Sequence, residues 1–171
     1  VLKVSADGRR LLYDFLVDEA YSGTWIEAIA VDGSGRVWLT GYADSGFSPL
    51  LNPMQPAASL HGDEALVARV NAAGTALDFS TLLGGRDEDF GQRIALGGGG
   101  LVYVIGSTNS RDFPVRNAAS GSWHGDYDGF LVKIDPAASR LLYATYVGGD
   151  GEDHLAGLAV MPAGEVWVAG L

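Results

Sequence analysis

The feature that most constrains the fold of this chain is an internal repeat with a period of about 64 residues. The segment LDFSTLLGGRDEDF, which begins at Leu77, aligns with LLYATYVGGDGEDH, which begins at Leu141. In both segments a Gly-Gly pair precedes an acidic cluster. A second mark is the glycine that ends an apolar strand, and it recurs at Gly41, Gly106 and Gly170. Since both marks keep the same spacing, the chain consists of copies of one supersecondary unit.

Each repeat contains four short pieces that are rich in β-branched, aromatic and leucine residues, as is typical of strands. In the first complete repeat these pieces are residues 26–32, 36–41, 65–71 and 76–83. Hairpin signals separate the first piece from the second, for example Gly33-Ser34-Gly35. The chain also has 25 glycines among 171 residues, and glycine is poorly tolerated inside helices. We therefore expect an all-β fold.

The second piece of each repeat is apolar on both faces. Val37 and Leu39 alternate with Trp38, and Val166 and Val168 alternate with Trp167. A sheet with one solvated face would alternate apolar with polar residues, so neighbouring sheets must cover both faces here. Radial stacking of four-stranded antiparallel blades provides this cover, and we therefore predict a β-propeller. A parallel β-solenoid is the alternative architecture.

The repeat boundaries predict one propeller fragment over residues 1–171. Its expected parts are the outer half of a blade at 1–17, complete blades at 26–83 and 91–147, and the inner half of a blade at 155–171. Joining the two halves within one chain would give about three blades, below the usual range of about 4 to 8. We therefore expect a partial, open arc that belongs to a longer protein. Its partners would be further blades of that protein or, through self-association, a second copy.

Composition disfavours several classes of function. The formal net charge is −10, from 11 basic and 21 acidic residues, which disfavours nucleic acid and anionic membranes as partners. The chain has no cysteine, so we expect no disulfide and no thiolate metal site. It also has no apolar run of about 20 residues, so we expect no membrane insertion.

Five segments carry motifs of a known family. They are ALVARVNAAGT (65–75), FSTLLGGRDEDFG (79–91), GSTNSRDFP (106–114), FLVKIDPAA (130–138) and YATYVGG (143–149). Together they resemble the SBBP family of bacterial β-propeller repeats. The first copy departs from the pattern, with VDEA at 17–20 in place of Gly-Gly and GFSP at 46–49 in place of DFP. The resemblance implies bacterial export and an extracellular or cell-surface location, and it provides no catalytic residues.

The acidic loops are a candidate Ca²⁺ site, and Ca²⁺ is the one cofactor that the sequence suggests. Their carboxylates are Asp87, Glu88, Asp89, Asp150, Glu152 and Asp153. Carboxylate oxygens are ligands that Ca²⁺ prefers. The spacing does not match an EF-hand loop, and the alternative is that these residues solvate turns and accept hydrogen bonds from neighbouring backbone.

A second candidate site lies in the long segments 42–63 and 107–126, which blade topology places on the same face as the acidic loops. Its residues are Trp123, His124, Asp126, His61 and Asp63. An aromatic ring beside polar groups can stack on a sugar. The alternative is that Trp123 fills a gap between blades. His154 stands where Phe90 stands in the preceding repeat, and we expect both to occupy the same half-buried position.

These patterns favour a non-catalytic scaffold or binding module that presents loops to a protein or glycan ligand. The sequence has no Ser-His-Asp order, no phosphate-binding glycine motif and no His-rich metal spacing. The alternative is a polysaccharide hydrolase or lyase that uses the acidic face. Paired carboxylates at separations of about 5 to 9.5 Å can cleave glycosides.

Overall fold

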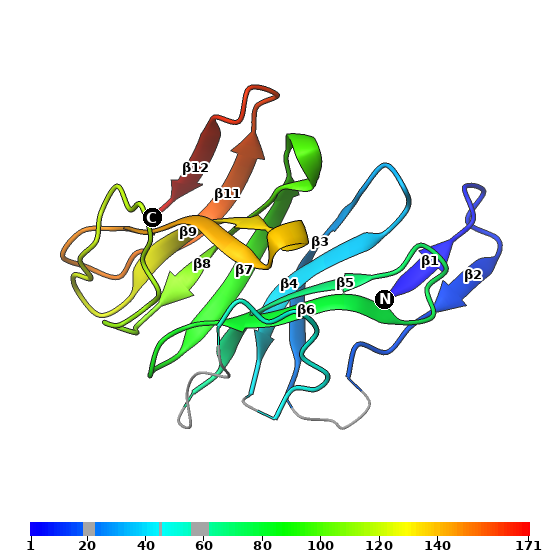
Figure 1. Ribbon diagram of the computed structural model, residues 1–171, viewed down its shortest axis with the longest axis horizontal. Helices are drawn as coiled ribbons and strands as arrows, with labels where there is room; N and C mark the ends of the chain where they lie inside the picture. Colours follow the sequence, from blue (N-terminus) through cyan, green and yellow to red (C-terminus); the bar gives the residue numbers. More distant parts are fainter. Residues whose placement is uncertain (19–22, 45, 56–61) are drawn as a thin grey trace.

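A computed structural model describes residues 1–18, 23–44, 46–55 and 62–171, and strands make up nearly all of its regular structure (Figure 1). The expected all-β fold is confirmed. Two short 3₁₀ helices, η1 (Gly98–Gly100) and η2 (Pro136–Ala138), lie in turns between strands. Within the described residues, no helix has the length and apolar character needed to cross a membrane.

Two four-stranded antiparallel sheets form the centre of the molecule, as expected. The first contains β3 (Trp25–Val31), β4 (Val37–Ala43), β5 (Glu64–Val70) and β6 (Leu77–Leu83). The second contains β7 (Asp89–Leu96), β8 (Val102–Thr108), β9 (Asp128–Asp135) and β10 (Arg140–Val147). Each strand pairs with the next along the chain, so both sheets are meanders. Asp89, which the sequence places in a loop, is the first residue of β7.

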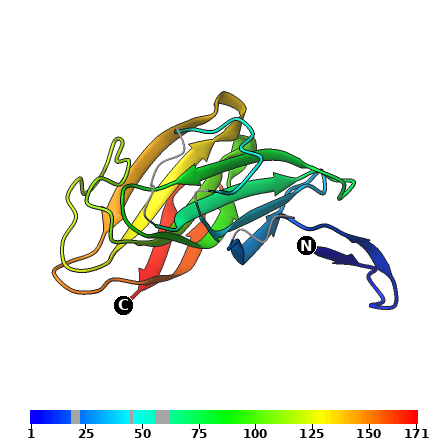
Figure 2. The same cartoon turned by 90° about the horizontal axis from the view of Figure 1, so that it is seen from below.

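Two hairpins flank the sheets. One consists of β1 (Leu2–Val4) and β2 (Leu11–Asp14), and the other of β11 (Leu155–Val160) and β12 (Val166–Gly170). They lie at opposite ends of the molecule in both views (Figures 1 and 2). The strands that the structure describes therefore form an open arrangement of sheets and do not close into a ring.

The two inner strands of each four-stranded sheet, β4 and β5 in the first and β8 and β9 in the second, are buried on both faces. In β4, Leu39 packs into a core shared with the β1–β2 side, where Val1 and Phe15 contact it. The neighbouring Trp38 points the other way, into the core between the two large sheets, where its ring lies 5.5 Å from that of Phe79. In the second sheet, Val104 belongs to this same inter-sheet core, whereas Ile105 packs toward β11 and β12. Adjacent apolar residues in these strands therefore belong to different cores, as expected for a sheet that is covered on both faces.

The glycine that recurs at the end of the second strand is required by a close backbone approach. A Cβ atom at Gly41, Gly106 or Gly170 would collide with the carbonyl oxygen of Trp25, Phe90 or His154, respectively. In each case the opposite strand has a β-bulge next to this point. A bulge bends its strand toward the partner, so only a residue without a side chain fits there.

We predict that Gly106→Ala destabilises the fold, because the new methyl group would meet both the Phe90 carbonyl and the Phe130 ring. Overpacking of this kind lowers the free energy of unfolding by about 1–3 kcal/mol, which thermal and denaturant unfolding would measure. Gly98→Ala is the matched control, since a Cβ at position 98 meets no atom within 4 Å. Equal stability of the two variants would contradict the packing argument.

Candidate functional site

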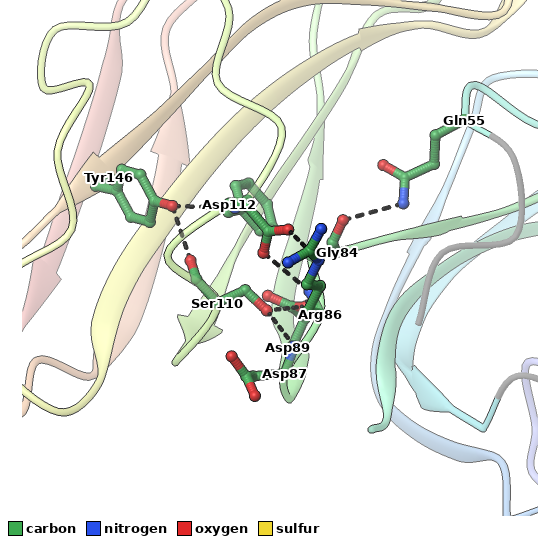
Figure 3. A network of polar contacts seen from close by, with 10 residues as sticks. Gln55, Gly84, Arg86, Asp87, Asp89, Ser110, Asp112 and Tyr146 are labelled. Carbon is green, nitrogen blue, oxygen red and sulfur yellow. Dashed lines mark hydrogen bonds and ion pairs between the residues drawn. The ribbon is translucent and has the colours of Figure 1, made fainter. Parts of the chain in front are cut away.

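The loop between β6 and β7 is tied to the segment that follows β8 (Figure 3). The Ser110 hydroxyl donates a hydrogen bond to Asp89 Oδ2 (2.9 Å) and accepts one from the Asp87 N–H (2.9 Å). The Arg86 N–H donates to Asp112 Oδ1 (3.0 Å), and the Arg86 side chain lies 3.4 Å from Asp112 Oδ2. These contacts confirm that the first acidic loop and the segment after β8 share one face of the molecule.

Tyr146 fixes the other side of this segment. Its hydroxyl donates to the Ser110 carbonyl (2.8 Å) and accepts from the Phe113 N–H (3.1 Å). The Phe113 ring stacks on Phe130 at a centroid distance of 4.7 Å. Phe47, in the divergent first copy of this motif, is buried as Phe113 is. The conspicuous motif at 106–114 therefore anchors a loop to the core.

Two buried carboxylates meet beside Gly84. Asp89 is fully buried, and its Oδ2 also accepts a hydrogen bond from the Gly85 N–H (2.8 Å). Glu64, the first residue of β5, is fully buried as well. A Cβ atom at position 84 would collide with both Glu64 Oε2 and Asp89 Oδ2. The Gly-Gly pair of the repeat thus leaves the space that the two carboxylates occupy.

The same arrangement recurs one repeat later. Asp153 Oδ2 accepts a hydrogen bond from the Gly149 N–H (2.8 Å), as Asp89 does from Gly85. A Cβ atom at Gly148 would lie 2.7 Å from both Asp128 Oδ1 and Asp153 Oδ2. Asp128 is only 1 % exposed, like its counterpart in the first sheet. An acidic pair around a Gly-Gly turn is therefore a repeated part of the junction between sheets.

Burial changes the protonation of these groups. It raises the pKa of Asp89 to about 7, and the charge of Glu64 adds to the increase, whereas the hydrogen bonds that Asp89 accepts oppose it. Burial also raises the pKa of Asp128, to which the charge of Asp153 contributes. Asp89 therefore binds a proton near neutral pH, at which an aspartate in the unfolded chain is ionised.

The carboxylates considered as Ca²⁺ ligands do not converge. Four of them are exposed: Asp87, Glu88, Asp150 and Glu152. Glu88 Oε2 accepts a hydrogen bond from the Tyr127 hydroxyl (2.5 Å), and Asp89 and Asp153 accept from their own turns. In the part of the chain that the structure describes, no three acidic or histidine side chains are placed to hold a metal ion. The contacts favour the alternative in which the acidic residues organise turns.

The residues considered for sugar stacking are also dispersed. Trp123 is half-buried against the inter-sheet core, and the Arg111 guanidinium lies 4.6 Å from its ring centroid. His124 and Asp126 are exposed. Asp63 is half-buried, and its carbonyl accepts the Asp89 N–H (2.7 Å). His61 lies outside the described residues. This environment favours the gap-filling interpretation of Trp123.

A cavity lies at the opposite ends of the strands, between the β3–β4 and β7–β8 turns. It has a volume of about 670 Å³ and is lined in part by Arg36, Trp38 and Arg69. Arg36 is paired with Asp32 at 2.7 Å. Arg69 is paired with Asp78 and lies 4.9 Å from the Trp38 ring centroid. Both arginines are thus engaged within the protein, and the cavity presents no unpaired arginine to a ligand.

The sequence interpretation missed two sets of residues. Glu64 and Asp128 stand one period apart as the first residue of the third strand of each sheet, so the repeat could have identified them. A smaller pocket of about 350 Å³, the aromatic pocket, is lined by Tyr42, Phe90 and Tyr127 among others. Because these residues come from different strands and loops, no local motif could have grouped them.

Comparison with known proteins gives no assignment. No protein-family model matches the chain, and no curated protein matches its sequence. The resemblance to SBBP repeats therefore depends on the motifs quoted above, and function has to be argued from the structure of the sites.

We predict that the stability of the protein decreases between about pH 4 and pH 7 in part because of Asp89. Its pKa is raised to about 7 in the folded state, against about 3.9 in the unfolded chain. The folded state therefore binds the proton more tightly, so the free energy of unfolding falls as pH rises through this range. Asp89→Asn, which cannot ionise, should show a shallower decrease when melting is followed against pH.

Asp87→Asn is the control for this measurement, because Asp87 lies in the same loop and is exposed. It should retain the pH dependence of the original sequence. An Asp89→Asn profile parallel to that of Asp87→Asn would show that Asp89 ionises in the folded protein as it does in the unfolded chain.

Proposed function

We propose that the chain is part of a β-propeller that acts as a non-catalytic binding module, with loops on a blade scaffold presented to a protein or glycan ligand. The radial arrangement is supported by contacts between the first strands of successive sheets, since β7 contacts both β3 and β11. It is further supported by the burial of the inner strands of each large sheet on both faces. The resemblance to SBBP repeats and the net charge of −10 fit a bacterial exported or cell-surface protein.

The observation that carries this proposal is the use of the acidic residues within the fold. Glycoside cleavage requires two carboxyl groups that face a substrate from opposite sides. Asp89 and Asp153 instead accept hydrogen bonds from the glycine N–H groups of their own turns, and this arrangement recurs in successive repeats. The repetition is typical of a structural role, and it favours the binding module over a hydrolase or lyase.

The proposal is tested by measuring binding and turnover on one panel of polysaccharides and surface proteins. We expect saturable binding to at least one member and no release of new reducing or unsaturated ends. Product release that exceeds that of heat-denatured protein would favour the hydrolase or lyase. An absence of binding across the panel would contradict the binding role.

We also propose that further blades or a second copy cover the two end hairpins. Large apolar side chains are exposed there, including Leu2 (68 %), Leu11 (58 %) and Trp167 (69 %). Exposed apolar surface on strands with free edges promotes association. If a β1–β2 hairpin paired with a β11–β12 hairpin, the resulting sheet would have four strands, the same number as each complete sheet.

The chain by itself should therefore self-associate at micromolar concentration, as measured by light scattering. Trp167→Lys should reduce the association because it places a charge on the exposed face of β12. Val115→Lys should leave it unchanged, since Val115 is exposed in a loop away from both hairpins. A stable monomer at all concentrations would contradict the proposal.

A further inference from the structure

The aromatic pocket lies where three sheets meet, on the face that carries the first acidic loop. Tyr42 contributes from β4, Phe90 from β7 and Ser107 from β8, and Tyr127 and His154 directly precede β9 and β11. The rings of Tyr42 and Phe90 meet edge to face at 4.9 Å, and those of Tyr127 and His154 stack at 6.4 Å. A volume of about 350 Å³ is within the range of small-molecule sites.

Two β-bulges direct polar side chains to this pocket. Glu27 is the extra residue of the bulge in β3, and Gln92 is the corresponding residue in β7. Both line the pocket. Bulges often re-aim a side chain beside a binding site. The bulges that lie opposite Gly41 and Gly106 therefore also place two polar side chains in the lining of the pocket.

The pocket is electronegative. Neither lysine nor arginine lines it, whereas the Glu27 carboxylate does. Glu88 Oε2 accepts the Tyr127 hydroxyl at 2.5 Å, which brings a second carboxylate to its edge. The surrounding charges act on the rings themselves: the hydrogen bond to Glu88, together with burial, raises the pKa of Tyr127 to about 12. Burial and the charge of Glu27 raise the pKa of Tyr42.

One hydrogen-bond acceptor on a residue that lines the pocket has no partner among the described residues. Gln92 Nε2 donates to the Ser107 hydroxyl (3.2 Å), which orients the amide. Gln92 Oε1 is then buried without a hydrogen-bond partner. An N–H donor on a ligand would satisfy it, and a buried acceptor without a donor is costly.

We propose that the aromatic pocket binds a sugar that carries a free, protonated amino group. Aromatic faces attract an organic cation and also pack against the apolar face of a sugar ring. The Glu27 carboxylate complements the positive charge, and Gln92 Oε1 accepts an ammonium N–H. This inference rests on the proposed binding function and names the chemistry of one ligand.

The test is a titration by ligand-detected NMR with glucosamine and with N-acetylglucosamine, which keeps the ring and lacks the charge. We expect a dissociation constant of about 1 mM or tighter for glucosamine and much weaker binding of N-acetylglucosamine. An amide of lysine serves as a cation without the sugar ring, and we expect it to bind more weakly than glucosamine. Equal binding of the two sugars would overturn the role of charge, and tighter binding of the lysine amide would overturn the assignment to a sugar.

Three variants locate the site. Glu27→Gln and Phe90→Leu should each weaken glucosamine binding about two- to fivefold, the range for one exposed cation–π or charge contact. Glu165→Gln, at an acidic position outside this pocket, should leave binding unchanged. Because Glu27 is exposed, its substitution should not affect folding, and unchanged melting would verify this. This inference would be overturned if glucosamine did not bind, or if Glu165→Gln weakened binding as much as Glu27→Gln does. The proposed binding function would then still be tested separately by the panel of polysaccharides and surface proteins.

Discussion

The structure depends on one constraint: each four-stranded sheet is apolar on both faces and must be covered twice. Leu39 and Trp38, adjacent in β4, belong to two separate cores on opposite sides of the same sheet. A single sheet of this composition would leave both of these faces in water, at a cost of about 25 cal/mol for each Å² of apolar surface. Stacking of successive repeats is therefore the condition under which any one repeat is stable.

The repeated motifs organise each sheet and its junction with the next one. Glycines near the ends of the second strands allow the backbone of the bulged first strands to pair closely within each sheet. The Gly-Gly turns leave room for the carboxyl pairs Glu64–Asp89 and Asp128–Asp153. The Ser110 and Asp112 contacts then connect the first of these turns to the following sheet. A carboxyl group whose pKa is raised to about 7 is the consequence of burying an acid at such a junction.

Sequence reasoning was sufficient for the architecture of the sheets because strand periodicity and turn chemistry are local. Trp38 and Leu39 revealed cover on two faces, and blade topology placed the first acidic loop on the same face as the segment after β8. It was not sufficient for the sites. The sequence shows the charge of the acidic residues but not the direction in which their side chains point. It therefore suggests Ca²⁺ ligands in the acidic loops, whereas Asp89 points inward. The aromatic pocket combines Tyr42, Phe90 and Tyr127, whose proximity depends on how three sheets pack.

Native-state hydrogen exchange tests most directly the claim that neighbouring sheets are stable only together. Since β4 and β5 share the inter-sheet core with β8 and β9, their amides should exchange through one common opening with the same free energy. The end hairpins β1–β2 and β11–β12 should exchange faster. Exchange of the first sheet at a free energy different from that of the second would show that each sheet is stable alone, and would contradict the account.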